Sequence, residues 1–258
     1  MERRSFIKKS AAATGAAFVG GTLTAGQVQP SVRDIYELKI YQLTGRGSIN
    51  PLQKYYENAV IPFLEKRGAK VGAFSEYSQE EPPRVYILHA YKSPEDYWNS
   101  LQEMKSDPTF LKASKSYSDL PASQPVYERY ETLLMEAFAG IPQLKMPPKD
   151  RGLFELRIYE SYNEDAFRRK VKMFDDEELP LFEKVGLHPL FFGELIAGSY
   201  MPALVYMLWF KDMEQREANW KKFIDSDEWD TMRVKEEYAD TVSKVRKIFL
   251  TPLEFSQI

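Results

Sequence analysis

The stretch Tyr36-Glu37-Leu38-Lys39-Ile40-Tyr41 recurs 118 residues later as Phe154-Glu155-Leu156-Arg157-Ile158-Tyr159. Residues 61–68 and 179–186 match at the same offset. Further along, the offset drifts to 120, where residues 85–88 match 205–208 and residues 106–107 match 226–227. Four collinear blocks in one order predict two copies of a single structural unit.

Each copy has the predicted order strand, helix, strand, strand, helix, strand. Apolar and polar residues alternate over 36–41, and helical spacing of apolar residues extends over 51–67 and 164–185. This order is that of the ferredoxin-like β-α-β-β-α-β unit, an α+β fold. We predict two tandem ferredoxin-like repeats, over residues 32–139 and 151–258, that close face to face as one α/β barrel. Residues 140–150 contain three prolines and are predicted to be a linker.

Composition bounds the function. Of 258 residues, 43% are apolar and 28% charged, and the net charge is −3. These values fit a folded protein without a membrane span and argue against nucleic acid as a partner. The chain has no cysteine and only two histidines, His89 and His188. We therefore expect neither a metal site nor a bound cofactor.

The N-terminus has the composition of a signal peptide, which we assign to residues 1–28. Arg3-Arg4-Ser5-Phe6-Ile7-Lys8 is followed by a mildly apolar, glycine-containing stretch. The paired arginines resemble the twin-arginine (Tat) export signal. That resemblance implies the Tat machinery as a partner and a periplasmic or extracellular destination.

The alternation in the first strand also suggests a site. We expect Tyr36, Leu38 and Ile40 to face the helices and the intervening polar side chains to line the barrel lumen. There they could bind a small polar or aromatic ligand, or simply pair with one another across strands. His89 is expected to join them, with Trp209 as its counterpart. The candidate ligand-binding residues are Glu37, Lys39, Tyr41, His89, Glu155, Arg157, Tyr159 and Trp209. Because arginine can hold a carboxylate with two hydrogen bonds, we expect the second-repeat set to contribute more than the first.

The repeated first-strand motif resembles that of the NIPSNAP family, an aromatic residue followed by Glu-Leu-Arg-x-Tyr. Residues 180–186, 209–213 and 227–229 resemble later family blocks, whereas the first repeat has Lys39 in place of arginine and lacks the late tryptophan. The resemblance implies the dimeric α/β-barrel superfamily, which includes haem-degrading monooxygenases and cofactor-independent oxygenases, but it does not imply a reaction.

Two hypotheses follow for the function. The first is an exported barrel that binds a small ligand. The alternative is an enzyme, either a cofactor-independent oxygenase or isomerase acting on a small anionic or aromatic substrate, or a haem-binding or haem-degrading protein. The sequence leaves the oligomeric state open, a homo-oligomer included.

Overall fold

The computed structural model describes residues 32–45, 49–78 and 82–258. The expected signal peptide, with Arg3 and Arg4, lies outside the described residues. The described residues form one compact unit. Within the described ranges, no helix is long and apolar enough to cross a membrane.

Eight antiparallel strands close into a single barrel in the order β1-β3-β2-β8-β5-β7-β6-β4. The strands are β1 Ile35–Leu43, β2 Lys70–Glu76, β3 Arg84–Tyr91, β4 Tyr127–Ala137, β5 Leu153–Glu160, β6 His188–Ala197, β7 Ala203–Phe210 and β8 Lys244–Pro252. Each repeat contributes four adjacent strands, and the seams β2–β8 and β4–β6 join the two halves. The predicted α+β fold with an intramolecular barrel is confirmed.

The β4–β6 seam depends on a glycine. Gly193 pairs with Ala137 across the seam, and a Cβ atom at Gly193 would lie 2.7 Å from Cβ of Met135. Because that distance is shorter than any ordinary carbon contact, only glycine lets the two strands approach this closely.

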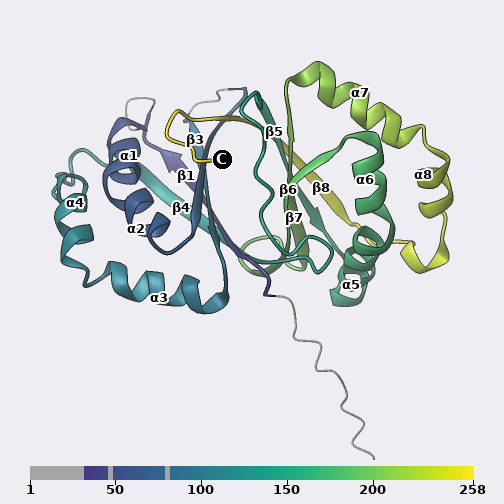
Figure 1. The fold of residues 1–258 in the computed structure, drawn as a ribbon, viewed down its shortest axis with the longest axis horizontal. Helices are drawn as coiled ribbons and strands as arrows, with labels where there is room; N and C mark the ends of the chain where they lie inside the picture. Colours follow the sequence, from purple (N-terminus) through teal and green to yellow (C-terminus); the bar gives the residue numbers. More distant parts are fainter. Residues whose placement is uncertain (1–31, 46–48, 79–81) are drawn as a thin grey trace, which may run out of the picture. The chain divides into compact units, whose positions relative to one another are not determined.

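Helices cover the outside of the barrel, those of the first repeat on one side and those of the second on the other (Figure 1). They are α1 Ile49–Tyr55, α2 Ile61–Glu65, α3 Pro94–Met104, α4 Pro108–Ser118, α5 Glu164–Met173, α6 Leu179–Val185, α7 Met213–Ile224 and α8 Asp227–Met232. Five of them begin with a side chain that accepts a backbone hydrogen bond, as helix N-caps do; the capping residues are Ser93, Asp107, Asn163, Asp212 and Ser226.

The first helix of each repeat contains a π-helical segment, at Tyr56–Val60 and at Phe174–Glu178. Residue Ile61 donates its backbone N–H to Tyr56, five residues back, and Leu179 donates to Phe174 in the same way. A proline follows each of these donors in the sequence. Proline has no N–H and its ring crowds the preceding turn, so a widened turn is a physical consequence of the repeated proline.

The barrel lumen is filled with apolar side chains from both repeats. Tyr36 and Leu38 are fully buried in this cluster with Phe154 and Leu156, and the rings of Tyr36 and Phe191 lie 4.8 Å apart across it. An eight-stranded barrel is just wide enough for side chains to fill. The expectation that Tyr36, Leu38 and Ile40 face the helices is therefore wrong, because they point into the lumen.

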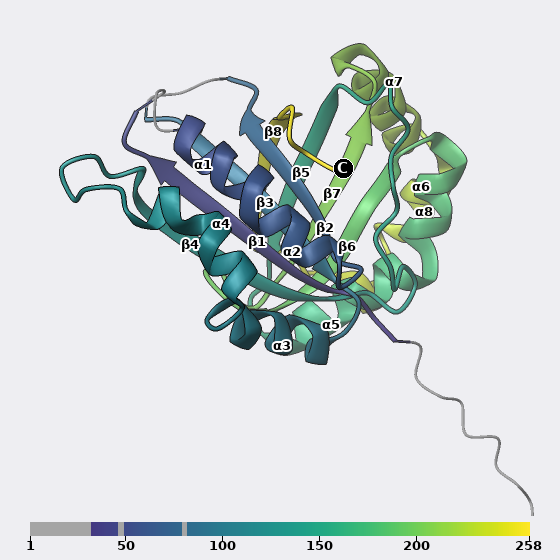
Figure 2. The same cartoon turned by 60° about the vertical axis from the view of Figure 1, so that its left-hand side comes forward.

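The lumen is closed at one end. The side chain of Ile258 is fully buried in the lumen cluster, and Leu144 of the linker packs against it. The backbone of Gln257 donates to Val71, and the backbone of Leu144 donates to the buried carboxylate of Asp34. Both segments thus lie against the same end of the barrel. Figure 2 shows the linker running beside the C-terminus.

Candidate functional site

The polar residues of the repeated motif lie on the outward face of the barrel, beneath the helices. Tyr41 packs with Leu52 and Tyr56 of the first helix, and Arg157 contacts Trp220 of α7. The two repeats therefore hold two equivalent polar clusters between sheet and helices, and neither lines the lumen.

The first-repeat cluster comprises Glu37, Lys39, His89 and Tyr91. Glu37 and His89 stand opposite each other in the β1–β3 register, and Oε2 of Glu37 is 2.9 Å from Nδ1 of His89. Lys39 Nζ lies 3.4 Å from the other carboxylate oxygen, and the Tyr91 hydroxyl lies 3.4 Å from His89 Nδ1. The Glu37 and His89 side chains are only 5% and 4% exposed.

Burial and pairing set the protonation of this pair. Burial lowers the pKa of His89 more than the neighbouring Glu37 raises it, so the imidazole is neutral near pH 7. Burial alone would raise the pKa of Glu37, but the hydrogen bond from His89 and the charge of Lys39 outweigh it and hold that pKa below its ordinary value. A neutral imidazole that donates Nδ1–H to a carboxylate keeps its lone pair on Nε2. Within the described part of the chain, that buried Nε2 has no hydrogen-bond partner.

Tyrosines connect the first-repeat cluster to the surface. The hydroxyls of Tyr41 and Tyr56 are 3.1 Å apart, and the Tyr41 ring packs 5.1 Å from that of Tyr130. Lys39 Nζ lies 5.2 Å from the centre of the Tyr130 ring, which is 45% exposed. The cluster thus reaches solvent along Lys39 and Tyr130.

The second-repeat cluster is tied more completely. The Glu155 carboxylate is fully buried. It accepts hydrogen bonds from Trp220 Nε1 at 2.8 Å and from Arg216 Nε and Nη2 at 2.9 and 3.1 Å. Arg157 forms an ion pair with the same carboxylate, with its Nε 3.1 Å from Oε1 of Glu155. Three hydrogen bonds and one ion pair hold this carboxylate in place, so it has little capacity left for a ligand.

The rest of the second-repeat cluster is also internally paired. Arg157 Nη1 donates to the hydroxyls of Tyr159 and Tyr206 at 3.0 and 3.1 Å. Close by, the buried ammonium of Lys170 pairs with Glu178. Burial raises the pKa of Glu178 although Lys170 opposes the shift. These contacts match the alternative in which the charged side chains pair with one another and do not bind a ligand.

The covering helices account for the difference between the two clusters. When the N-cap residues of α3 and α7 are aligned, Tyr97 and Leu101 stand where α7 has Arg216 and Trp220. Among the described residues, α3 donates no hydrogen bond to Glu37. The only buried residue of α3 is Ser100, whereas α7 buries Asn219, Trp220 and Phe223.

Sequence reasoning did not identify Arg216 as a partner of Glu155. A signal was present, because Arg216 and Trp220 are four residues apart and therefore lie on one helix face. The expected equivalence of His89 and Trp209 is wrong. Lys39 pairs with Ile87 and Arg157 pairs with Tyr206, so the true offset in this strand is 119 and Leu208 is the counterpart of His89.

Trp209 lies away from both clusters. Its ring stacks on that of His188 at 4.6 Å, and the two line a surface pocket of about 570 Å³ with linker residues such as Met146. The described residues contain no group of three or more His, Asp or Glu side chains that could hold a metal ion.

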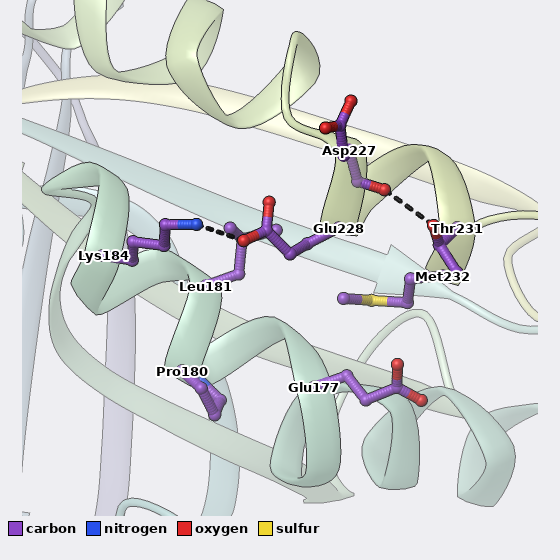
Figure 3. Close-up of a pocket in the computed structure, with 8 residues that line it drawn as sticks. All are labelled: Glu177, Pro180, Leu181, Lys184, Asp227, Glu228, Thr231 and Met232. Atoms are coloured by element: carbon purple, nitrogen blue, oxygen red, sulfur yellow. Dashed lines mark hydrogen bonds and ion pairs between the residues drawn. The ribbon is translucent and has the colours of Figure 1, made fainter.

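A groove between α6 and α8 is drawn in Figure 3. Its floor includes Leu181 and Met232. Lys184 on one wall pairs with Glu228 on the other, while the Glu177 carboxylate points away from them and pairs with Lys235. Because three of its four charged side chains, those of Lys184, Glu228 and Glu177, are already paired, this groove offers a ligand less than the first-repeat cluster does.

The fold resembles those of several solved structures. A "putative monooxygenase" from Lactobacillus acidophilus NCFM is 10% identical, with 85% of this chain and 94% of that chain covered and a TM-score of 0.58. An anthrone oxidase-like protein is 9% identical, with 86% and 92% covered and a TM-score of 0.50. At such identities the likeness shows the fold alone.

A NIPSNAP-like domain protein from Burkholderia xenovorans is 19% identical over 41% of this chain and 89% of its own, with a TM-score of 0.38. No curated protein gives a significant match to the sequence. The model of the NIPSNAP family matches residues 154–257, which include β5 with Glu155, Arg157 and Tyr159. The second repeat is therefore the part of this chain that is similar to a NIPSNAP domain.

Proposed function

We propose that the protein binds a small organic ligand between the sheet and the helices of the first repeat, and that Glu37 and His89 move a proton to or from it. The observation that carries the proposal is the buried Nε2 of His89, which has no partner among the described residues. A buried polar atom without a partner is costly, so a ligand that donates a proton or a hydrogen bond there would be stabilised.

The pair has the arrangement of a general base. Glu37 fixes the tautomer and the orientation of the imidazole through the 2.9 Å contact at Nδ1, which leaves Nε2 as the proton acceptor. When Nε2 takes a proton, the adjacent carboxylate stabilises the imidazolium. The carboxylate of Glu155 is not available in this way, because three hydrogen bonds and an ion pair with Arg157 hold it.

Access to His89 would come through α3, because Ser100 is the only residue that this helix buries. Tyr97 of α3 packs on Tyr91 at 5.3 Å, and the Tyr91 ring lies 6.1 Å from the imidazole. A displacement of α3 would therefore open the site on the side of Tyr91, while Tyr56 still packs against the imidazole at 5.8 Å. The activities in the neighbours' names are oxidations, and oxidation or isomerisation of an activated carbon acid can begin with such a proton abstraction. Haem binding has less support, because His89 is enclosed and His188 is stacked on Trp209.

Two measurements test the proposal on the purified protein without residues 1–28. Nitrogen-15 NMR of the imidazoles should show His89 neutral at pH 7 with its proton on Nδ1; a protonated Nε2 would remove the base. Enolisation of phenylpyruvate, an anionic aromatic carbon acid, should be accelerated and should lose that acceleration in His89→Asn. Asparagine keeps a donor toward Glu37 but has no atom at Nε2. His188→Asn is the matched control and should keep the wild-type rate.

We also propose that the chain is exported, on the basis of Arg3 and Arg4 and the apolar stretch that follows them.

A further inference from the structure

The end of the barrel opposite Ile258 holds a further pocket, which we call the mouth pocket. It has a volume of about 400 Å³ and lies where β1 and β5 end and where β3, β4 and β8 begin. Its lining residues are Ile40, Gln42, Arg84, Tyr86, Arg129, Glu131, Ile158, Tyr200, Arg246, Lys247 and Ile248. Ile40, Tyr86, Ile158 and Ile248 also belong to, or pack against, the apolar lumen cluster, so the mouth pocket has an apolar floor.

Strand register places three arginines around that floor. Gln42 of β1 pairs with Arg84 on one side and with Arg129 on the other, and Arg246 pairs with Ile158. Residues paired in register share a face of the sheet, so all three arginines are on the lumen side. Lys247 pairs with Arg157, which puts its side chain on the outward face although its strand borders the pocket.

The arginines are positioned with donors to spare. Arg246 Nε donates to Glu160 at 2.6 Å, and the guanidinium lies 4.0 Å over the ring of Tyr200. Arg84 Nη1 lies 3.6 Å from Glu76. Arg129 forms no ion pair or hydrogen bond with any residue in the described ranges. A guanidinium carries five N–H donors, so Arg129 and Arg246 keep donors available for a ligand.

The turn that carries Tyr200 also indicates that the mouth pocket binds a ligand. Tyr200 has φ of 76°, a conformation that is unfavourable for a bulky residue. Strained backbone concentrates where a side chain is needed in one place, and here the ring supports the Arg246 guanidinium at the rim.

We propose that the mouth pocket binds a small organic monoanion, with its carboxylate or sulfonate on Arg129 and Arg246 and its apolar part on Ile40, Ile158 and Ile248. Around this pocket the three arginines are balanced by three carboxylates, those of Glu76, Glu131 and Glu160. The site therefore suits a single negative charge better than a polyphosphate. This inference is independent of the first-repeat cluster, because it uses the opposite face of the sheet.

The experiment compares naphthalene-2-carboxylate with its neutral analogue naphthalene-2-methanol, on protein with isotope-labelled isoleucine methyl groups. The acid should shift the methyl resonances of Ile40, Ile158 and Ile248 and bind at least roughly tenfold more tightly than the alcohol, the usual scale for a charge-assisted hydrogen bond. Arg129→Gln should abolish that preference. Lys247→Gln, one residue from Arg246 but on the other face, should retain it.

Three results would overturn the proposal: equal affinity for acid and alcohol, equal weakening by Arg129→Gln and Lys247→Gln, or no methyl shift at millimolar acid. His89→Asn should leave this binding unchanged, so the mouth pocket and the proton-transfer site succeed or fail separately.

Discussion

Glu37 and Glu155 occupy the same position in the two repeats, yet Glu37 faces His89 while Glu155 faces Leu208 in the strand register. One carboxylate therefore holds an imidazole whose second nitrogen is free of partners within the described chain, and the other is enclosed by Arg216, Trp220 and Arg157. The same strand position thus pairs with a histidine in one half of the barrel and is enclosed by paired side chains in the other.

The cover of the first-repeat cluster should open more readily than that of the second. Because α3 buries only Ser100 and α7 buries three residues, amide hydrogen exchange should be clearly faster in α3. Mass spectrometry on peptides from the two helices checks this. Equal protection would mean that α3 is not the route to His89.

Acidification should destabilise the protein in two stages. Burial lowers the pKa of His89 in the folded state, so the unfolded chain binds that proton more readily and stability falls as pH drops below the ordinary value of 6.5. The pKa of Glu37 is also lowered, so its stabilising contribution is present above the ordinary value of 4.5 and is lost below it.

Urea unfolding between pH 8 and about pH 2 measures both stages of this profile. His89→Asn should flatten the upper stage. Burial lowers the pKa of His188 too, so His188→Asn is needed as the parallel control. A profile that His89→Asn leaves unchanged would contradict a buried neutral imidazole.

The two carboxylates should differ in their value to stability. Glu155→Gln leaves Arg157 and Arg216 without their counter-ion and should cost about 3–5 kcal/mol, as for other broken buried pairs. Glu37→Gln should cost less, roughly 1–3 kcal/mol, because Lys39 reaches solvent. Free energies of unfolding from denaturant titrations decide this, and the opposite ranking would refute the structural role of Glu155.

The β4–β6 seam should be sensitive to one methyl group. Gly193→Ala brings a Cβ to 2.7 Å from Met135 and should cost about 1–3 kcal/mol, the usual range for overpacking. In a Met135→Gly background, which lacks the opposing Cβ atom, Gly193→Ala should cost less than it does in the wild type, as a double-mutant cycle measures. If the single variant is as stable as the wild type, the seam is looser than the distance indicates.

Export should depend on the paired arginines. Changing Arg3 and Arg4 to lysine should retain the precursor inside the cell while the protein still folds, because the described barrel begins after them. Fractionation of cells that express both versions, followed by immunoblotting, measures this. Unchanged export would exclude the twin-arginine route.

The repeats and the barrel could be predicted from the sequence because matching blocks such as 36–41 and 154–159 carry both the strand alternation and its register. The sequence could not predict which face of the sheet points into the lumen, because the closed barrel buries both faces. Leu38 meets other apolar side chains in the lumen, and Glu37 finds its partner under a helix. Alternation separates the two faces but does not say which one faces the helices.

The residue of the second repeat that corresponds to His89 was misidentified for a related reason. A strand has a period of two, so a shift of a single residue in the repeat alignment exchanges its faces. The shift from 119 to 120 paired His89 with Trp209 and concealed that the second repeat has an aliphatic residue, Leu208, at that place.

The two halves of the barrel belong to one polypeptide and are joined by the linker at residues 140–150. In a barrel made from two identical chains, any substitution appears twice and must suit both copies. Here a change such as Leu101 for Trp220, or His89 for Leu208, occurs once in each barrel. One half can keep a rigid, self-paired cluster that maintains the fold while the other half gives up those contacts and acquires a reactive group.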